Sequence, residues 1–163
     1  MRVLVSAASK YGSTAEIAEA IGKELAGAGH DVDVRTPDDV ASIDGYDTAV
    51  LGSAVYVGHW LEPMGKLIER ERDALAKRPV WLFSSGPLGE PPMPAGDKAV
   101  EIDPIVEATG ARGHALFNGK LDKHRLSFPE RAVVFALRVA EGDYRDWDAI
   151  SSWAREIAGE LSA

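Results

Sequence analysis

The chain has 163 residues, which is enough for one domain (residues 1–163) with a substantial buried core. It has no cysteine, which excludes disulfides, thiolate metal sites and cysteine nucleophiles. The formal net charge of −8 argues against nucleic acid as a partner, because neutralising phosphates requires clustered lysine and arginine. No apolar run is long enough for a signal peptide or a transmembrane segment, and we expect a cytoplasmic protein.

Short apolar strands alternate with segments of helical spacing along the whole chain. Ile17, Ile21 and Leu25, for example, are four residues apart. In chain order the pattern predicts a strand at 3–7, a helix at 14–28, strands at 31–35 and 48–52, a helix from 62 to 77–79, a strand at 80–84, a helix near 104–108, an edge strand at 113–117 and a helix at 150–161. Such alternation predicts a three-layer, doubly wound α/β fold with a parallel sheet covered on both faces.

The loop after the first strand has the composition of a phosphate site. It consists of Ser9, Lys10, Tyr11, Gly12, Ser13 and Thr14 and leads directly into a helix. Ligands of open α/β sheets bind outside the carboxyl ends of the strands. Backbone N–H groups at a helix N-terminus, joined by neutral hydroxyls, are suited to a phosphate monoester. The alternative is that Ser13 or Thr14 simply caps the helix.

The loop after the 48–52 strand suits a flat heteroaromatic ring. Its small and flexible residues are Ala54, Val55, Val57 and Gly58, and Tyr56 and Trp60 each offer a stacking surface. The alternative for Trp60 is that it fastens the loop to the following helix, and we favour that alternative. Tyr56 and His59 are the only nearby side chains with proton-donor capacity, which makes them weak catalytic candidates. No cluster of His, Asp or Glu surrounds His59, so we predict no metal site.

The loop after the 80–84 strand suits a rigid backbone track along the edge of a planar ligand. It contains Ser85, Gly86, Pro87, Leu88 and Gly89. The alternative is a plain turn. Each of the three loops is weak evidence alone, but all three follow buried strands in the order that a ligand site of this fold requires.

These loops resemble those of the flavodoxin family. The pattern Ser9-x-x-Gly12-x-Thr14 is similar to the family's phosphate loop, hydroxyl-x-x-Gly-x-Thr. The later loops resemble the branch that contains menaquinone-dependent protoporphyrinogen oxidase and many bacterial flavodoxin-domain proteins. The resemblance covers essentially the whole chain. It implies a five-stranded sheet in the order 2-1-3-4-5, with the phosphate of FMN on the first loop and its isoalloxazine between the other two.

Two departures from the family pattern shape the functional expectation. Ser9 replaces the usual threonine, and Leu88 stands where electron-transfer flavodoxins commonly have an aromatic residue. A less stacked, more accessible ring favours an FMN-dependent oxidoreductase of the protoporphyrinogen-oxidase-related group, acting on a quinone or small molecule. One alternative is a non-enzymatic electron carrier between redox partner proteins. Another is a domain that binds a different phosphorylated ligand, or none.

Residues 118–145 differ from a minimal flavodoxin. Within them, residues 128–138 have the pattern of an amphipathic helix, with Arg131 and Arg138 among apolar residues. Such a helix could contact a peripheral membrane surface or a partner. It could instead pack on the sheet or form the interface of a homodimer, which we favour. The acidity of the chain further disfavours contact with anionic lipid.

Overall fold

A six-stranded sheet forms the centre of the protein. The structure, a computed structural model, describes residues 1–10, 12–56, 58–86, 101–121 and 142–162. The sheet has the order β2-β1-β3-β5-β6, and these five strands are parallel. Their bounds are β1 Arg2–Ala8, β2 Asp31–Arg35, β3 Thr48–Tyr56, β5 Val80–Ser85 and β6 Gly113–Phe117. The order 2-1-3-4-5 expected for the parallel strands is confirmed.

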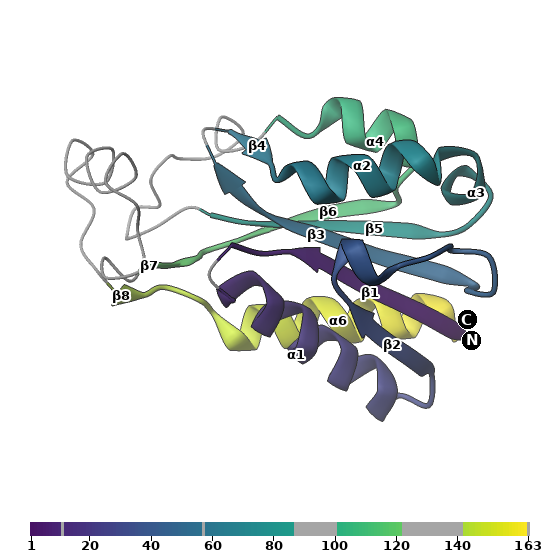
Figure 1. Ribbon diagram of the computed structural model, residues 1–163. Coiled ribbons are helices and arrows are strands. Elements are labelled where there is room, and N and C mark those ends of the chain that lie inside the picture. The colour runs from purple at the N-terminus through teal and green to yellow at the C-terminus, as the bar shows by residue number, and fades with distance from the viewer. Residues whose placement is uncertain (11, 57, 87–100, 122–141, 163) are drawn as a thin grey trace.

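Helices cover both faces of the sheet (Figure 1). The helices α1 (Ser13–Gly27) and α6 (Trp147–Leu161) lie on one face, and α2 (Glu62–Arg70), α3 (Arg72–Ala76) and α4 (Asp103–Thr109) lie on the other. A 3₁₀ turn, η1 (Pro37–Asp39), follows β2. Alternate residues of β1 enter the two cores: Val3 and Val5 pack with α1 and α6, and Leu4 packs with α2. The central strands are therefore apolar on both faces, as their sequences indicate.

The two largest differences from the predicted elements concern the helix from residue 62 and the strand at 48–52. The helix expected from 62 to 77–79 is interrupted at Glu71, whose carboxylate accepts a hydrogen bond from the Ile43 N–H at 3.0 Å. The strand predicted at 48–52 continues to Tyr56, and β4 (His59–Trp60) folds back on it as an antiparallel hairpin. The second ligand loop is therefore a short β-hairpin.

The region after β6 is described only at its ends. The strands β7 (Lys120–Leu121) and β8 (Gly142–Asp143) pair antiparallel there. The amphipathic segment predicted at 128–138 lies outside the described residues. In the part of the chain that is described, no helix is both long and apolar enough to cross a membrane.

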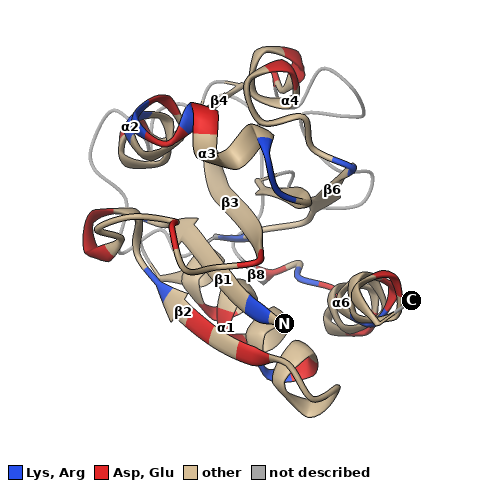
Figure 2. Cartoon of the chain, turned by 90° about the vertical axis from the view of Figure 1, so that its right-hand side faces the viewer, with Lys and Arg blue, Asp and Glu red and all other residues tan. Residues whose placement is uncertain are grey.

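The charged residues are dispersed at the end of the molecule where both termini lie. Figure 2 shows this end, with acidic and basic residues interspersed over β2, α1, α2 and α6. Arg2, for example, forms an ion pair with Asp33 at 3.2 Å.

An aromatic cluster packs against the middle of β3, on the face of the sheet that α1 and α6 cover. The rings of Phe83, Phe117 and Trp153 pack with centroids 5.6 to 6.2 Å apart. The Phe83 ring lies directly over Gly52, where an added Cβ would come within 2.2 Å of it. Glycine at position 52 therefore makes room for a fully buried phenylalanine.

We predict that Gly52→Ala lowers the free energy of unfolding by roughly 1–3 kcal/mol, because a methyl group at this position displaces a packed ring. Urea denaturation would measure the change. Gly159→Ala is the matched control: Gly159 lies within α6, and an added Cβ there meets no atom within 4 Å. The control should raise stability by roughly 0.5–1 kcal/mol, the usual gain from alanine in a helix. Equal effects of the two substitutions would contradict this account of the packing.

Candidate ligand site at the carboxyl edge of the sheet

The first turn of α1 begins at a left-handed glycine. Gly12 has φ 89° and ψ −14°, and its N–H donates a hydrogen bond to the Ser9 hydroxyl at 3.0 Å. The Gly12 carbonyl accepts from the Glu16 N–H, which closes the first helical turn. An L side chain is strained at this φ, so glycine suits the tight entry into the helix.

No described side chain caps this helix. The alternative that Ser13 or Thr14 caps it is therefore not what the structure shows: α1 starts at Ser13, and its N-cap is Gly12. The N–H groups of the first turn, at positions 13–15, have no partner within the helix. By contrast, α6 is capped by Asp146, whose carboxylate accepts from the Ala149 N–H at 3.0 Å. The N-terminus of α1 thus retains its capacity to bind an anion.

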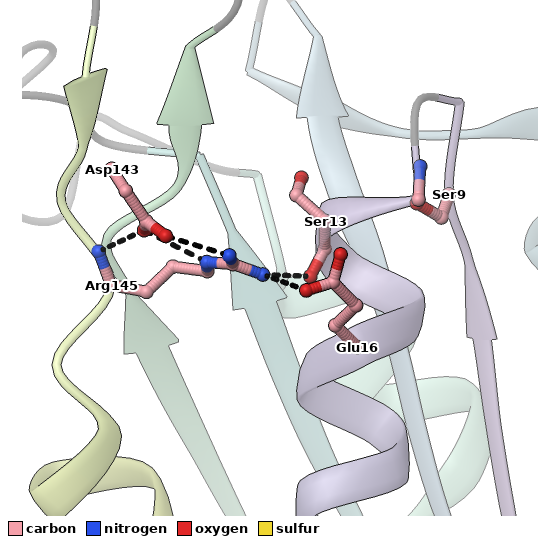
Figure 3. A network of polar contacts seen from close by, with 6 residues as sticks. Ser9, Ser13, Glu16, Asp143 and Arg145 are labelled. Atoms are coloured by element: carbon pink, nitrogen blue, oxygen red, sulfur yellow. Dashed lines mark hydrogen bonds and ion pairs between the residues drawn. The ribbon is translucent and has the colours of Figure 1, made fainter.

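Arg145 fastens the C-terminal part of the chain to this first turn (Figure 3). Its guanidinium donates to the Ser13 carbonyl and to the Glu16 carboxylate, both at 3.1 Å. It also donates to both carboxylate oxygens of Asp143, at 2.9 and 2.7 Å. The Arg145 side chain is only 4% exposed, and its guanidinium carbon lies 4.6 Å from the centre of the Trp147 ring. We call this set of contacts the Arg145 clamp.

The electrostatics of the clamp keep its central pair charged. The hydrogen bond from Arg145 holds the pKa of the Asp143 carboxyl below its usual value, and the same bond raises the pKa of Arg145. All three guanidinium nitrogens already have partners: Nε and one terminal nitrogen donate to Asp143, and the other donates to Glu16 and the Ser13 carbonyl, so Arg145 braces the first turn of α1. Sequence reasoning missed this residue, because 132 positions separate Ser13 from Arg145 and nothing in the local pattern links them.

An opening in the surface includes residues of the clamp. It is lined by Asn118 and by residues 143–148. Asp143, Asp146 and Asp148 are among them, and the first two already accept hydrogen bonds from Arg145 and Ala149. Because these carboxylates repel an anion, the opening is a poorer phosphate site than the N-terminus of α1.

The three predicted loops lie together in the part that is described. The Lys10 ammonium is 5.4 Å from the centre of the Tyr56 ring, which places the first loop against the hairpin. An added Cβ on Gly86 would lie 2.9 Å from the Val55 Cβ, and the Gly86 N–H donates to the Phe117 carbonyl at 3.2 Å. The hairpin is therefore flanked by the first loop and by the start of the third.

The weak catalytic candidates sit at the tip of the hairpin. Tyr56 pairs with His59 across it, and the His59 imidazole lies 3.5 Å from the Glu101 carboxylate with 66% of its side chain exposed. Trp60 has a different environment: its ring packs against the core under α2, and its indole N–H donates to the Ser84 hydroxyl at 2.7 Å. Trp60 thus fastens the hairpin to the sheet. The remaining predicted contacts, Tyr11, Val57, Pro87, Leu88 and Gly89, lie outside the described residues.

We predict that Arg145→Met lowers the free energy of unfolding by roughly 1–2 kcal/mol at neutral pH, because it removes the guanidinium donors of the Ser13 carbonyl and of Asp143, which keeps, among the described residues, only the backbone N–H of residue 145 at 3.1 Å. The pKa of Asp143 is depressed in the folded state, so its contribution is present above its ordinary pKa of 3.8 and is lost as the pH falls below that value. The difference in the free energy of unfolding between wild type and variant should therefore become smaller toward pH ~3.

The matched control is Arg155→Met. Arg155 also links α6 to α1, through Glu24 at 3.4 Å, but 65% of its side chain is exposed. Its loss should change stability by less than about 0.5 kcal/mol. Urea denaturation of both variants at neutral and acid pH tests the clamp. An equal loss of unfolding free energy in both variants, or a loss in Arg145→Met that does not depend on pH, would contradict the role given to Arg145.

Comparison with known proteins agrees with this geometry. The family model described as "Flavodoxin domain" matches residues 4–148, and no curated protein sequence matches the chain. The fold is similar to that of a flavodoxin from the domain Archaea (19% identity over 100% of both chains, TM-score 0.66). It is also similar to flavodoxin 1 of Bacillus cereus (15% identity over 98% of both chains, TM-score 0.66). A third similar structure is rubredoxin oxygen:oxidoreductase of Desulfovibrio gigas. The match covers 99% of this chain and 36% of that protein (12% identity, TM-score 0.66). Because the family model spans most of the sequence, the chain belongs to the flavodoxin-domain family, whose fold is a flavin-binding, electron-transfer fold.

Proposed function

We propose that the protein binds FMN, with the phosphate at the N-terminus of α1 and the isoalloxazine between the β3–β4 hairpin and the segment after β5. The observation that carries this proposal is the entry into α1. Its glycine is left-handed, the Ser9 hydroxyl shapes the turn, and no described side chain occupies the helix end. The N–H groups of residues 13–15 and the hydroxyls of Ser13 and Thr14 would hold the phosphate.

The donor set fits a phosphate monoester. Backbone N–H groups and hydroxyls bind an anion through neutral dipoles, and the helix dipole adds a favourable field. One nearby cation, Arg145, is already bound by two carboxylates. A phosphate there would therefore be held by hydrogen bonds, while Arg145 keeps the first turn in place.

The hairpin and the third loop would hold the ring. Residues 54–58 and 85–89 would offer backbone groups to its polar edge, and Tyr56 a surface beside it. When bound, the flavin supplies the electron and hydride chemistry, and the protein supplies binding, orientation and access. Tyr56 and His59 are the side chains we propose for moving a proton at the ring, and His59 is exposed enough to exchange that proton with solvent.

For the reaction itself we propose an FMN-dependent oxidoreductase of the protoporphyrinogen-oxidase-related group. The support is the sequence of the third loop, where Leu88 replaces an aromatic neighbour of the ring and leaves it open to a quinone or small molecule. The second candidate is an electron carrier between redox partner proteins. It is supported by the similar structures, two of which are flavodoxins that match this chain over 98% or more of both lengths.

We predict that Ser9→Ala and Thr14→Val each weaken FMN binding by about 10- to 100-fold, since each removes a group that shapes or supplies the phosphate site. Neither substitution should change the affinity for riboflavin, which has the same ring and no phosphate. Quenching of flavin fluorescence measures both affinities. Ser42→Ala is the control, because Ser42 is an exposed hydroxyl in the loop that precedes β3, at the opposite edge of the sheet. Equal losses for FMN and riboflavin would place the phosphate elsewhere.

Potentiometry of the FMN-loaded protein separates the two candidate functions. An oxidoreductase with an open ring should show a single two-electron potential and turn over a quinone without a protein acceptor. A dedicated carrier should show two well-separated one-electron potentials and reduce only protein partners. The second result would replace the enzyme proposal and leave FMN binding in place.

A further inference from the structure

A chain of hydrogen bonds crosses the sheet from its edge strand to the hairpin. The indole N–H of Trp60 on β4 donates to the Ser84 hydroxyl of β5 at 2.7 Å, and that hydroxyl lies 2.7 Å from Nε2 of His114 on β6. Ser84 is fully buried. All three side chains lie on the face of the sheet that α2 and α4 cover. Leu82 belongs to that core, is the register partner of His114 and stands two residues before Ser84 on the same strand. Trp60 packs against the same core. We call these three residues the hairpin tether.

The hydrogen bond from Trp60 to Ser84 has a defined direction. An indole N–H can only donate, so Ser84 accepts from Trp60. The same hydroxyl can donate its hydrogen to Nε2 of a His114 that carries its proton on Nδ1, or accept from Nε2–H with its second lone pair. The neutral imidazole completes the chain of hydrogen bonds in either tautomer. Burial, which lowers the pKa of His114, favours the same state.

Other backbone and side-chain contacts hold the hairpin beside the tether. Trp60 pairs with Val55 in the two-residue ladder of β4. The Ser53 hydroxyl accepts from the Leu61 N–H at 2.9 Å and closes the base of the hairpin. At its tip, the Gly58 carbonyl accepts from the Glu101 N–H at 2.7 Å. A two-residue antiparallel pairing is marginal by itself, so its position over β5 depends on such anchors.

We propose that His114 and Ser84 are positioning residues for the flavin: they hold Trp60, and through it the β3–β4 hairpin, at the place where the hairpin contacts the isoalloxazine. This inference rests on the proposed function. His114 itself lies on the edge strand and would not touch the ligand. Its effect on binding therefore passes entirely through the Ser84 hydroxyl and the Trp60 indole.

The first test compares two substitutions of His114. Glutamine can place a side-chain acceptor near the former Nε2, and phenylalanine has a similar ring without an acceptor. His114→Phe should weaken FMN and riboflavin by the same factor, about 10-fold, because the tether serves the ring and not the phosphate. His114→Gln should recover most of that loss. Equal loss of flavin affinity in both variants, or no loss in either, would overturn the proposal.

A double-mutant cycle tests the path through Ser84. Trp60→Phe and His114→Phe each break the same chain of hydrogen bonds, so the double variant should bind flavin about as tightly as either single variant. Additive losses would show that the two residues act separately and would contradict the tether. Leu161→Ala controls for lower stability, since it truncates a buried side chain of α6 and leaves the tether intact. Its flavin affinity should stay within about twofold of wild type.

A readout without flavin keeps the inference separate from the proposed function. In the flavin-free wild type, the Trp60 indole N–H should exchange slowly with solvent, as followed by NMR. In Ser84→Ala the same N–H should exchange at least 10-fold faster. If the protein binds no flavin but shows this protection, the proposed function fails and the tether stands as a structural device. If flavin binds while the Trp60 N–H is unprotected, the tether is wrong and FMN binding remains.

Discussion

The structure depends on burying both faces of a parallel sheet. The strands β1, β3 and β5 are apolar on both sides, so each must be followed by a crossover that brings a helix onto one face or the other. The central strands are therefore parallel, and the loops that follow them all lie at the same edge of the sheet. The phosphate loop, the hairpin and the loop after β5 meet there because of the core, before any ligand is considered.

The two parts of the proposed FMN site are stabilised in different ways. At the phosphate end, the helix N-terminus has neutral donors, and the Arg145 clamp braces it from a segment far along the chain. At the ring end, a two-residue ladder is braced by the hairpin tether from the edge strand. In both cases a buried polar side chain away from the ligand holds the segment that would contact the ligand: Arg145 holds the first turn of α1, and Ser84 holds the β3–β4 hairpin. This arrangement lets the ligand-facing surface consist of backbone and small side chains, which approach a ligand closely.

The strands and the phosphate loop could be predicted from the sequence because their signals are local. The apolar run 80–84 and the pattern from Ser9 to Thr14 each report on their own element. The β4 hairpin was missed because two residues carry no periodicity. Arg145 and His114 were missed for another reason: their roles come from partners distant in sequence, and one arginine in an acidic segment or one histidine in a strand looks like many others. The break at Glu71 likewise depends on a backbone N–H of residue 43.

The central claim is that the free N-terminus of α1 receives the phosphate of FMN. Titrating the isotope-labelled protein with FMN, and following its backbone amide signals by NMR, tests this claim most directly. The account predicts saturable shifts concentrated at residues 12–15, with a second group in the β3–β4 hairpin that riboflavin alone also produces. Shifts confined to the opposite edge of the sheet, or no saturable shift at residues 12–15, would contradict it.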